Sequence, residues 1–176
     1  TTAYTIVTGY RIDSGVLTGL LVPLPGSASD SGAYATSADG NVIVGRVRTG
    51  GYAYQGCYWV GTTLHVPPDL AGGADYSQAF GVSADGNVLV GAANSGAAPS
   101  YSLGEPCRWE NDVPLGLGSA PGGTAVGNAN SCNHNGSIVV GNTTVGGNSR
   151  AFIWDAAHGM RELSIVLTND YNLNLT

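Results

Sequence analysis

Three copies of one nine-residue pattern decide the fold: SADGNVIVG at 37–45, SADGNVLVG at 83–91 and NHNGSIVVG at 133–141. Each copy contains an Asp-Gly or Asn-Gly pair, followed by a short run of Val, Ile or Leu that ends in Gly. Such pairs suit hairpin turns that need a positive φ. The apolar residues stand on consecutive positions, which predicts a strand buried on both faces. Each copy therefore predicts a β-hairpin whose second strand lies in a core.

A Trp-bearing strand and a Gly-rich corner accompany each copy, and Ile12 takes the place of the Trp in a partial N-terminal copy. The steps from this position to the corner are each 14 residues: Ile12 to Gly26, Trp59 to Gly73 and Trp109 to Gly123. The steps to the next strand-ending Gly are 33, 32 and 32 residues, to Gly45, Gly91 and Gly141. Length varies only at 46–54, 92–104 and 142–149, which is typical of a repeat with one exposed variable loop.

Within a unit we expect four short strands. The first lies at 33–36 or 79–82, the second at 42–44, 88–90 and 138–140, the third carries the Trp, and the fourth returns at 63–66 or 113–117. Four strands in about 46–50 residues fit a β-propeller blade, whose repeats run to about 40–50 residues.

The sequence therefore predicts an all-β fold, a β-propeller-like array of four-stranded antiparallel repeats. A single repeat domain, 1–176, is divided into a partial unit at 1–26 and units at 27–73, 74–123 and 124–176. With about three and a half units the array is incomplete, because a closed propeller usually has about four or more blades. A β-solenoid, with shorter coils and one or two strands per turn, is the alternative.

Charge and hydropathy exclude several kinds of partner. All six basic residues are Arg, against twelve acidic residues, for a net charge of −6. Nucleic-acid binding is not expected, because it rests on clustered cationic contacts to phosphate. No apolar run approaches the roughly 20 residues that a membrane-spanning helix needs. We expect copies of the same chain, other surface proteins or glycans as partners.

The motifs resemble the bacterial extracellular HAF repeat family, whose units pair a SADG…VVG hairpin with an AF.W…GM..L strand. The closest match is AFIWDAAHGMREL at 151–163, followed by LTNDYNLNLT at 167–176, and the resemblance covers essentially the whole chain. It implies export, a propeller-like fold and a location outside the cell or at the bacterial cell surface. The family supplies no catalytic residue and no cofactor.

Two sets of residues could bind a ligand. Trp59, Trp109 and Trp154 could stack on sugars, but their fixed position inside a strand predicts packing between blades. Asp39 and Asp85 resemble part of a calcium loop, yet calcium takes about six to eight oxygens and each turn offers one carboxylate. A role in the turn is therefore the better interpretation of Asp39 and of Asp85.

The three cysteines show no spacing typical of a zinc site. Cys57 and Cys107 occupy the same position in successive units. In a solenoid such positions lie about 4.8 Å apart, near the range of a disulfide, whereas on neighbouring propeller blades they diverge. One disulfide with one thiol, or three thiols, both remain open. Cys132, on the first strand of the third unit, is expected to be a buried, inert thiol.

The remaining reactive residues form no recognisable constellation. The histidines lie in different positions of different units, with no spacing to a nucleophile: His65, His134 and His158. The single local carboxylate cluster comprises Glu105, Glu110 and Asp112. For this cluster we expect a solvated surface rather than the carboxylate pair of a glycosidase.

We therefore predict a non-enzymatic, secreted or cell-surface repeat module for adhesion or extracellular assembly, with no catalytic residue, metal or cofactor. A lectin-like propeller with one sugar pocket per unit is the alternative. The variable loops do not favour identical pockets, because one carries Tyr52 and Tyr54 and the next Tyr101. A glycan-cleaving enzyme using Glu105, Glu110 or Asp112 is the least favoured hypothesis.

Overall fold

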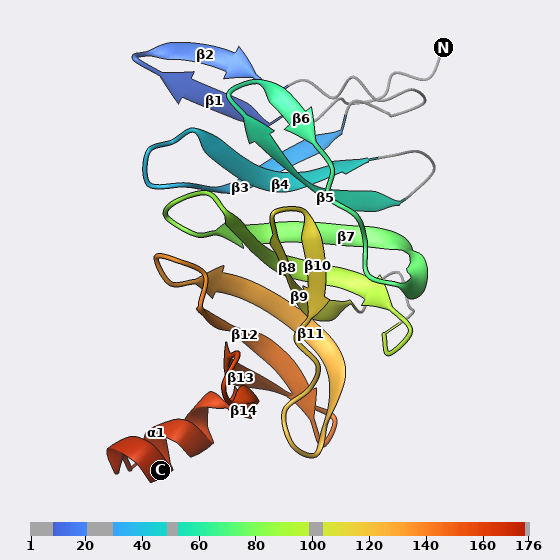
Figure 1. Ribbon diagram of the computed structural model, residues 1–176, viewed down its shortest axis with the longest axis vertical. Helices are drawn as coiled ribbons and strands as arrows, with labels where there is room; N and C mark the ends of the chain where they lie inside the picture. The colour runs from blue at the N-terminus through green and yellow to red at the C-terminus, as the bar shows by residue number, and fades with distance from the viewer. Residues whose placement is uncertain (1–8, 21–29, 49–52, 99–103, 175–176) are drawn as a thin grey trace.

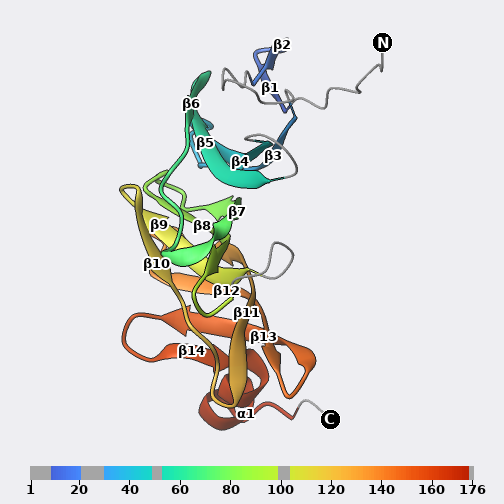
Figure 2. The same ribbon diagram turned by 90° about the vertical axis from the view of Figure 1, so that its right-hand side faces the viewer.

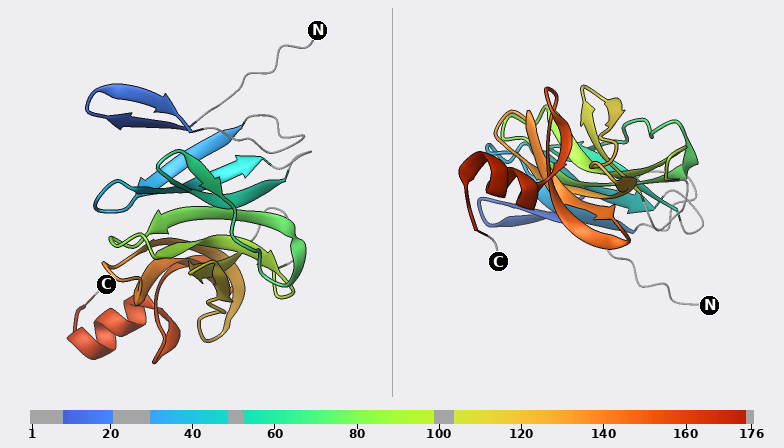
Figure 3. Two further views of the ribbon diagram at one scale, coloured as in Figure 1. Left: turned by 45° about the horizontal axis from the view of Figure 1, so that its top comes forward. Right: turned by 90° about the horizontal axis from the view of Figure 1, so that it is seen from below.

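A computed structural model describes residues 9–20, 30–48, 53–98 and 104–174 of the chain. In these ranges the strands form one two-stranded sheet and three four-stranded sheets, all antiparallel and each built from strands consecutive in the chain. Figure 1 shows the sheets stacked along the long axis of the molecule, from the first hairpin at one end to the helix at the other. Figure 2 and the left-hand view of Figure 3 show the same order.

The strands have the following bounds. The N-terminal hairpin comprises β1 (Tyr10–Asp13) and β2 (Val16–Gly19). The first four-stranded sheet comprises β3 (Ser31–Thr36), β4 (Val42–Arg48), β5 (Tyr54–Val60) and β6 (Thr63–His65). The second comprises β7 (Gly72–Val82), β8 (Val88–Ser95), β9 (Glu105–Glu110) and β10 (Val113–Gly116). The third comprises β11 (Gly123–Cys132), β12 (Ile138–Val145), β13 (Asn148–Asp155) and β14 (Gly159–Glu162), and helix α1 (Leu163–Tyr171) follows it.

This architecture confirms the predicted β-propeller-like array of four-stranded antiparallel repeats. In each four-stranded sheet the strand order follows the chain, and no described strand pairs with a strand of another sheet. A β-solenoid would hydrogen-bond equivalent strands of successive units to one another, so that alternative is wrong.

The N-terminal hairpin has the register of the last two strands of a complete sheet. Ile12 of β1 pairs with Leu17 of β2. In the same way Trp59 of β5 pairs with Leu64 of β6. The hairpin therefore represents the outer half of a repeat.

Several strands are longer than expected. β7 begins at Gly72 and β11 at Gly123, so the Gly-rich corners belong to the start of the next sheet; Gly26 lies outside the described residues. The segment 142–149, expected as a loop, is largely strand, since β12 and β13 stay paired up to Val145 and Asn148. Gly146 and Gly147 make this tight connection with φ values of 56° and 77°, as a two-residue hairpin turn requires.

The Asp-Gly turns also differ from a two-residue hairpin. Only the glycine of each pair has a positive φ, 73° at Gly40 and 79° at Gly86. The Gly40 amide donates to the Ser37 carbonyl, and the Ser37 amide donates to the Val42 carbonyl. The loop is therefore built around a turn that Gly closes in the left-handed region, as in longer hairpin loops.

The helix α1 was not expected from an all-β pattern. Its N-cap residue, Glu162, makes no side-chain capping bond, and Asn172 ends it in the left-handed conformation with φ of 54°. The helix contacts β13 and β14 and buries Val166. The helix is therefore held by tertiary packing and by its C-terminal cap, without a side-chain cap at its N-terminus.

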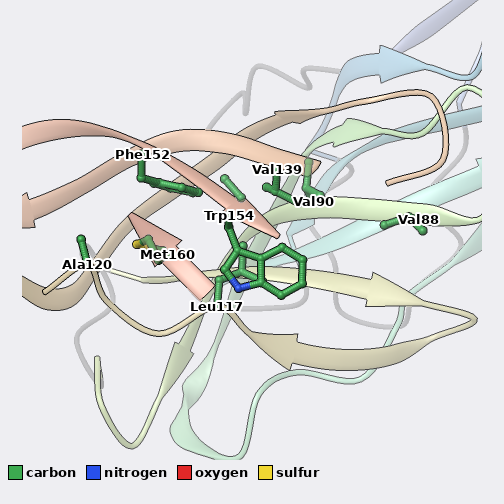
Figure 4. Packing of buried hydrophobic residues seen from close by; sticks show 9 residues of the cluster. Val88, Val90, Leu117, Ala120, Val139, Phe152, Trp154 and Met160 are labelled. Atoms are coloured by element: carbon green, nitrogen blue, oxygen red, sulfur yellow. The ribbon is translucent and has the colours of Figure 1, made fainter. Parts of the chain in front are cut away.

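The hydrophobic core is divided into layers between successive sheets, and one Trp lies in each. Trp59 is 0% exposed, Trp109 1% and Trp154 6%, which confirms the prediction that they pack between blades. Trp109 lies in a cluster with Val44 of the preceding sheet. Figure 4 shows the next layer, in which Trp154 and Phe152 of the third sheet meet Val88 and Val90 of the second.

The glycine that ends each nine-residue pattern allows a close approach between the first two strands of a sheet. A Cβ at Gly45 would lie 1.8 Å from the Gly32 carbonyl oxygen, and one at Gly91 would lie 1.9 Å from that of Gln78. The approach coincides with a register shift in the first strand, between Ala33 and Ala35 in β3. A bulge of this kind bends the strand and brings its backbone inward, so the pattern must end in Gly.

We expect Gly91→Ala to lower the free energy of unfolding by about 1–3 kcal/mol or more, because the methyl group cannot be accommodated without moving backbone. Gly96→Ala is the matched control, since nothing lies within 4 Å of a Cβ at that position. Urea unfolding followed by circular dichroism measures both. Equal stability of the two variants would contradict the explanation.

The repeat position that Trp59 and Ile12 share provides a second test, because one of the two residues is buried and the other is exposed. Trp59→Ala should cost about 3–5 kcal/mol, the usual loss for a large aromatic residue in a core. Ile12→Ala, at the equivalent position, should change stability by about 0.5 kcal/mol or less, because Ile12 is 72% exposed. The same unfolding measurement decides, and a large loss at Ile12 would show that β1 is covered.

Candidate functional site

The Asp-Gly turns satisfy their own carboxylates. Asp39 Oδ1 accepts hydrogen bonds from the Ser37 hydroxyl at 2.7 Å and the Asn41 amide at 3.0 Å. Asp39 Oδ2 accepts one from the Asn41 side chain at 2.7 Å. Asp85 repeats the arrangement with Ser83 and Asn87. Both oxygens therefore have protein donors, which supports turn chemistry over calcium binding.

The third copy builds the same turn from different residues. Asn133 replaces the serine, and its Oδ1 accepts from the Ile138 amide at 3.0 Å. Asn135 replaces the aspartate and accepts from the Ser137 amide at 3.2 Å. The turn thus survives without a carboxylate. Among the described residues, no group of three or more His, Cys, Asp or Glu side chains could hold a metal ion.

The hydrogen bond from Ser83, with those from Asn87, lowers the pKa of Asp85 below its usual 3.8, and Ser37 does the same for Asp39. A group whose pKa is lowered by folding stabilises the folded state above its unfolded pKa. That contribution is lost as the pH falls from 3.8 through the lower folded value. The turns therefore favour the folded state at neutral pH and cease to do so in acid.

Asp85→Asn should accordingly lower the midpoint of thermal unfolding at pH 7, and the difference from the wild type should shrink below pH 3.8. The exposed Asp75→Asn, outside the turns, is the control. Thermal melts at a series of pH values provide the measurement. A difference that stays constant across this range would exclude the ionised carboxylate as its cause.

The cysteines are three free thiols, with Cys57 and Cys107 buried and Cys132 partly buried. Cys57 and Cys107 lie in different layers of the core, as their positions on separate sheets require. Burial raises the pKa of all three thiols. At Cys132 the Arg108 guanidinium acts in the opposite direction, but burial is the larger influence, and a raised pKa disfavours the thiolate that a cysteine nucleophile needs.

The carboxylate cluster is divided among three environments. Glu105 is buried and accepts hydrogen bonds from the Ser95 hydroxyl and the Gly118 amide, so its predicted place on a solvated surface is wrong. The reason is that the residues around Ser95 and Gly118 fold over it. Glu110 is exposed and pairs with Arg108 at 2.9 Å, and Asp112 accepts from the Tyr58 hydroxyl at 3.2 Å.

The histidines lie apart. His65 stacks on Tyr58 with ring centroids 4.8 Å apart. His158 contacts Asp155 Oδ1 through Nδ1 at 2.8 Å. The His134 backbone carbonyl accepts a hydrogen bond from the Ala84 amide of the second sheet. None of them meets a candidate nucleophile in these contacts.

Successive sheets are joined by repeated polar contacts. The Gly9 amide donates to Ser31 Oγ at 3.0 Å, and the Gly56 amide donates to Ser77 Oγ at 3.0 Å. Between the turns, the Ala38 amide donates to the Ala84 carbonyl at 3.0 Å, and the Ala84 amide donates to the His134 carbonyl at 2.9 Å. The N-terminal hairpin is therefore docked on the first sheet as that sheet is docked on the second.

A groove of about 440 Å³ opens where this stacking is interrupted. We call it the open groove; β1 forms one wall, and β3 with its following turn forms the other. Its lining comprises Tyr10, Arg11, Ile12, Asp13, Ala33, Tyr34, Ala35, Thr36, Asp39, Gly40 and Ile43. Ala33 is exposed, whereas Ala79 and Ala129, at the same register position in the next two sheets, are 0% exposed. Among the described residues, no strand covers this position of the first sheet.

An arginine–tyrosine cluster lies beside the open groove. The guanidinium carbon of Arg46 lies 4.0 Å from the Tyr54 ring centroid and 5.9 Å from that of Tyr34. Arg46 donates to the Gln78 side-chain oxygen at 3.1 Å. Burial raises the pKa of Tyr34, although its side chain stays 43% exposed. The cluster joins β4 to the next sheet.

Of the tyrosines expected in variable loops, Tyr52 and Tyr101 lie outside the described residues.

The opposite end of the stack is also uncovered. Val44 and Val90, on the second strands of the first two sheets, are 0% exposed because the following sheet covers them. Val140 holds the same position in β12 and is 37% exposed, beside Ile138 at 40%. We call these two residues the C-terminal face. Helix α1 contacts β13 and β14 and leaves both residues accessible.

Comparisons with known proteins bear on the fold. No protein-family model matches the chain, and no curated protein matches it. Among solved structures, the chain is similar to a putative TolB from Agrobacterium tumefaciens, with a TM-score of 0.58 and 12% identity. The match covers 88% of this chain and 53% of that one. The likeness shows a β-propeller fold. This chain therefore spans about half the length of the similar structure.

One further observation concerns membranes: within the described residues, no helix is long and apolar enough to cross a bilayer. The resemblance to HAF repeats stays a prediction, because no family model tests it.

Sequence reasoning named Ile12 and Asp39 of the open groove only as residues of the repeat and its turn, and it did not predict a groove between them. A signal for the groove existed in the register, since Ala33, Ala79 and Ala129 each stand twelve positions before a pattern-ending Gly. The exposure of Ala33 could not be predicted from sequence, because it depends on which strands pack over β3 in the folded protein.

Proposed function

We propose that this chain is a non-enzymatic, exported module whose uncovered sheet faces mediate adhesion or extracellular assembly. The observation that carries the proposal is the contrast between equivalent positions. Val140 is 37% exposed at the C-terminal face, whereas Val44 and Val90 are 0% exposed inside the stack. In the first two sheets the equivalent face is covered by the sheet that follows, so the C-terminal face is suited to pack against another sheet.

The repeated residues support this proposal because they are engaged in folding. The Trp side chains lie between sheets, and the Asp-Gly turns use their carboxylates internally. The carboxylates at 105, 110 and 112 have separate partners. Buried Trp faces also remove the repeated stacking platforms on which a lectin-like module would depend.

Export and a location at the bacterial cell surface are part of the proposal. They are supported by the resemblance of the repeat motifs to HAF repeats. The composition agrees with this, since a net charge of −6 without Lys offers no basic surface for nucleic acid.

Self-association through the C-terminal face gives a direct test. We expect the wild-type chain to form larger species as its concentration rises, because exposed apolar sheet surface is buried on contact. Val140→Arg should abolish this association by placing a charge in the contact. Val113→Arg is the matched control, because Val113 is 66% exposed on β10, the last strand of its sheet.

Sedimentation velocity over the widest concentration range that solubility allows measures the effect. Circular dichroism shows that each variant is folded. A wild-type chain that stays folded and strictly monomeric over this range would refute the assembly role.

A further inference from the structure

The turn of the third copy has the backbone of the first two turns but lacks their carboxylate. Gly136 has a φ of 70°, and its amide donates to the Asn133 carbonyl at 3.0 Å. In the second copy Gly86 has a φ of 79°, and its amide donates to the Ser83 carbonyl at 3.0 Å. The two turns therefore share one backbone geometry and differ in the side chain that precedes the glycine.

The Asn135 side chain lies as the Asp85 carboxylate does. Asn135 Oδ1 accepts a hydrogen bond from the Ser137 amide at 3.2 Å, and Asp85 Oδ1 accepts one from the Asn87 amide at 3.1 Å. By this correspondence the NH₂ group of Asn135 takes the position of Asp85 Oδ2, which accepts from the Asn87 side chain at 3.0 Å. An oxygen in place of this NH₂ group would complete the match.

Donors for such an oxygen are already present in the third turn. Ser137 takes the place of Asn87, and its hydroxyl accepts a hydrogen bond from Asn133 Nδ2 at 3.1 Å. A hydroxyl also has a proton of its own to donate, and an amide NH₂ group has two. Ser137 and Asn133 can therefore both donate to a carboxylate at position 135.

The sequence supplies a reaction that makes this carboxylate. Asn135 is followed by glycine, and no other asparagine in the chain is. The Gly136 nitrogen can attack Asn135 Cγ because glycine has no Cβ to obstruct the approach. A new N–C bond forms, the bond from Cγ to the NH₂ group breaks, and ammonia leaves with the proton of the Gly136 amide. Water then opens the resulting succinimide at one of its two carbonyl groups, giving aspartate or isoaspartate.

The folded turn exposes this side chain and also restrains the reaction. Asn135 is exposed, so water reaches it. The Gly136 amide donates to the Asn133 carbonyl, however, and the attack on Cγ requires this hydrogen bond to open. The reaction should therefore be slower in the folded chain than in a linear peptide, at a rate set by local opening of the turn.

We propose that Asn135-Gly136 is a modification site, at which deamidation converts the third turn to the Asp-Gly form of the first two. Aspartate fits the turn because it keeps the backbone length and gains the Ser137 donor. Isoaspartate inserts a methylene group into the backbone and so disrupts the turn. Since Gly136 lies against Val88 of the second sheet, that product loosens the junction between the two sheets. This inference is independent of the proposed function.

Mass spectrometry of the full chain, aged in mildly alkaline buffer, tests the reaction. We expect Asn135 to be the first asparagine to exchange NH₂ for OH, because alkali removes the proton from the attacking nitrogen. Fragmentation by electron transfer locates the change and distinguishes aspartate from isoaspartate. A linear peptide of residues 131–139 gives the unrestrained rate, which should exceed that of the folded chain.

Asn148 is the internal control, because it is exposed on the same sheet and is followed by Ser149. It should react about tenfold more slowly or less, since the serine side chain obstructs the approach that glycine leaves open.

Asn135→Asp supplies the aspartate product without ageing. At pH 7 its Tm should exceed that of the wild type by about 1–3 °C, because the carboxylate gains charge-assisted hydrogen bonds. The gain should disappear below pH 3.8, the ordinary pKa of aspartate, as the carboxylate takes up a proton. Asn148→Asp is the matched control and should show no such gain.

Two results would each overturn the inference. If Asn135 reacts no faster than Asn148 in the folded chain, the Asn-Gly turn is not a modification site. If Asn135→Asp is no more stable than the wild type at pH 7, the third turn does not accept the carboxylate as the first two do.

Discussion

Every sheet in this molecule depends on its neighbours to cover it, because the repeat places apolar side chains on both faces. In the first four-stranded sheet, Val44 belongs to a core cluster with Ala79 and Trp109 of the next sheet. Its neighbour in the chain, Ile43, belongs to the opposite layer with Leu20 and Trp59. A single sheet of this kind cannot bury both sets of residues, so stability comes from pairs of sheets rather than from each one alone.

The polar and glycine positions of the repeat allow that covering. Gly86 lies against Val42 of the preceding sheet, and Gly136 lies against Val88, so each turn passes beneath a strand where a side chain would collide. The turns are also joined through the Ala38, Ala84 and His134 backbones. The conserved form of the three copies within this chain is thus explained by folding.

The architecture could be predicted from sequence because the spacing between the landmark residues recurs from one unit to the next. The spacing between Trp59, Gly73 and Gly91 reappears one unit later, and it fixed the number and order of strands. The helix α1 could not be predicted in this way, since its sequence contains Ile165, Val166 and Thr168, which favour strands. The burial of Glu105 was missed because its partners, Ser95 and Gly118, lie on other segments of the repeat, 10 and 13 residues away, and no sequence pattern links them to it. The tight Gly146-Gly147 turn could have been predicted in place of a longer loop, because Gly-Gly pairs favour hairpin turns.

The second strand of the sheet, β8 or β12, is buried to different extents in the second and third four-stranded sheets, and this difference affects the order in which the sheets unfold. All eight residues of β8 are buried, whereas β12 has exposed and half-buried positions along most of its length. In an array held by nearest-neighbour contacts, the local free energy of opening is highest where both neighbours are present. Fraying therefore begins at the terminal sheets and proceeds inward, so that β7–β10 is the last cooperative unit to melt. An added unit at either end would act as a cap and raise the stability of the sheet beneath it.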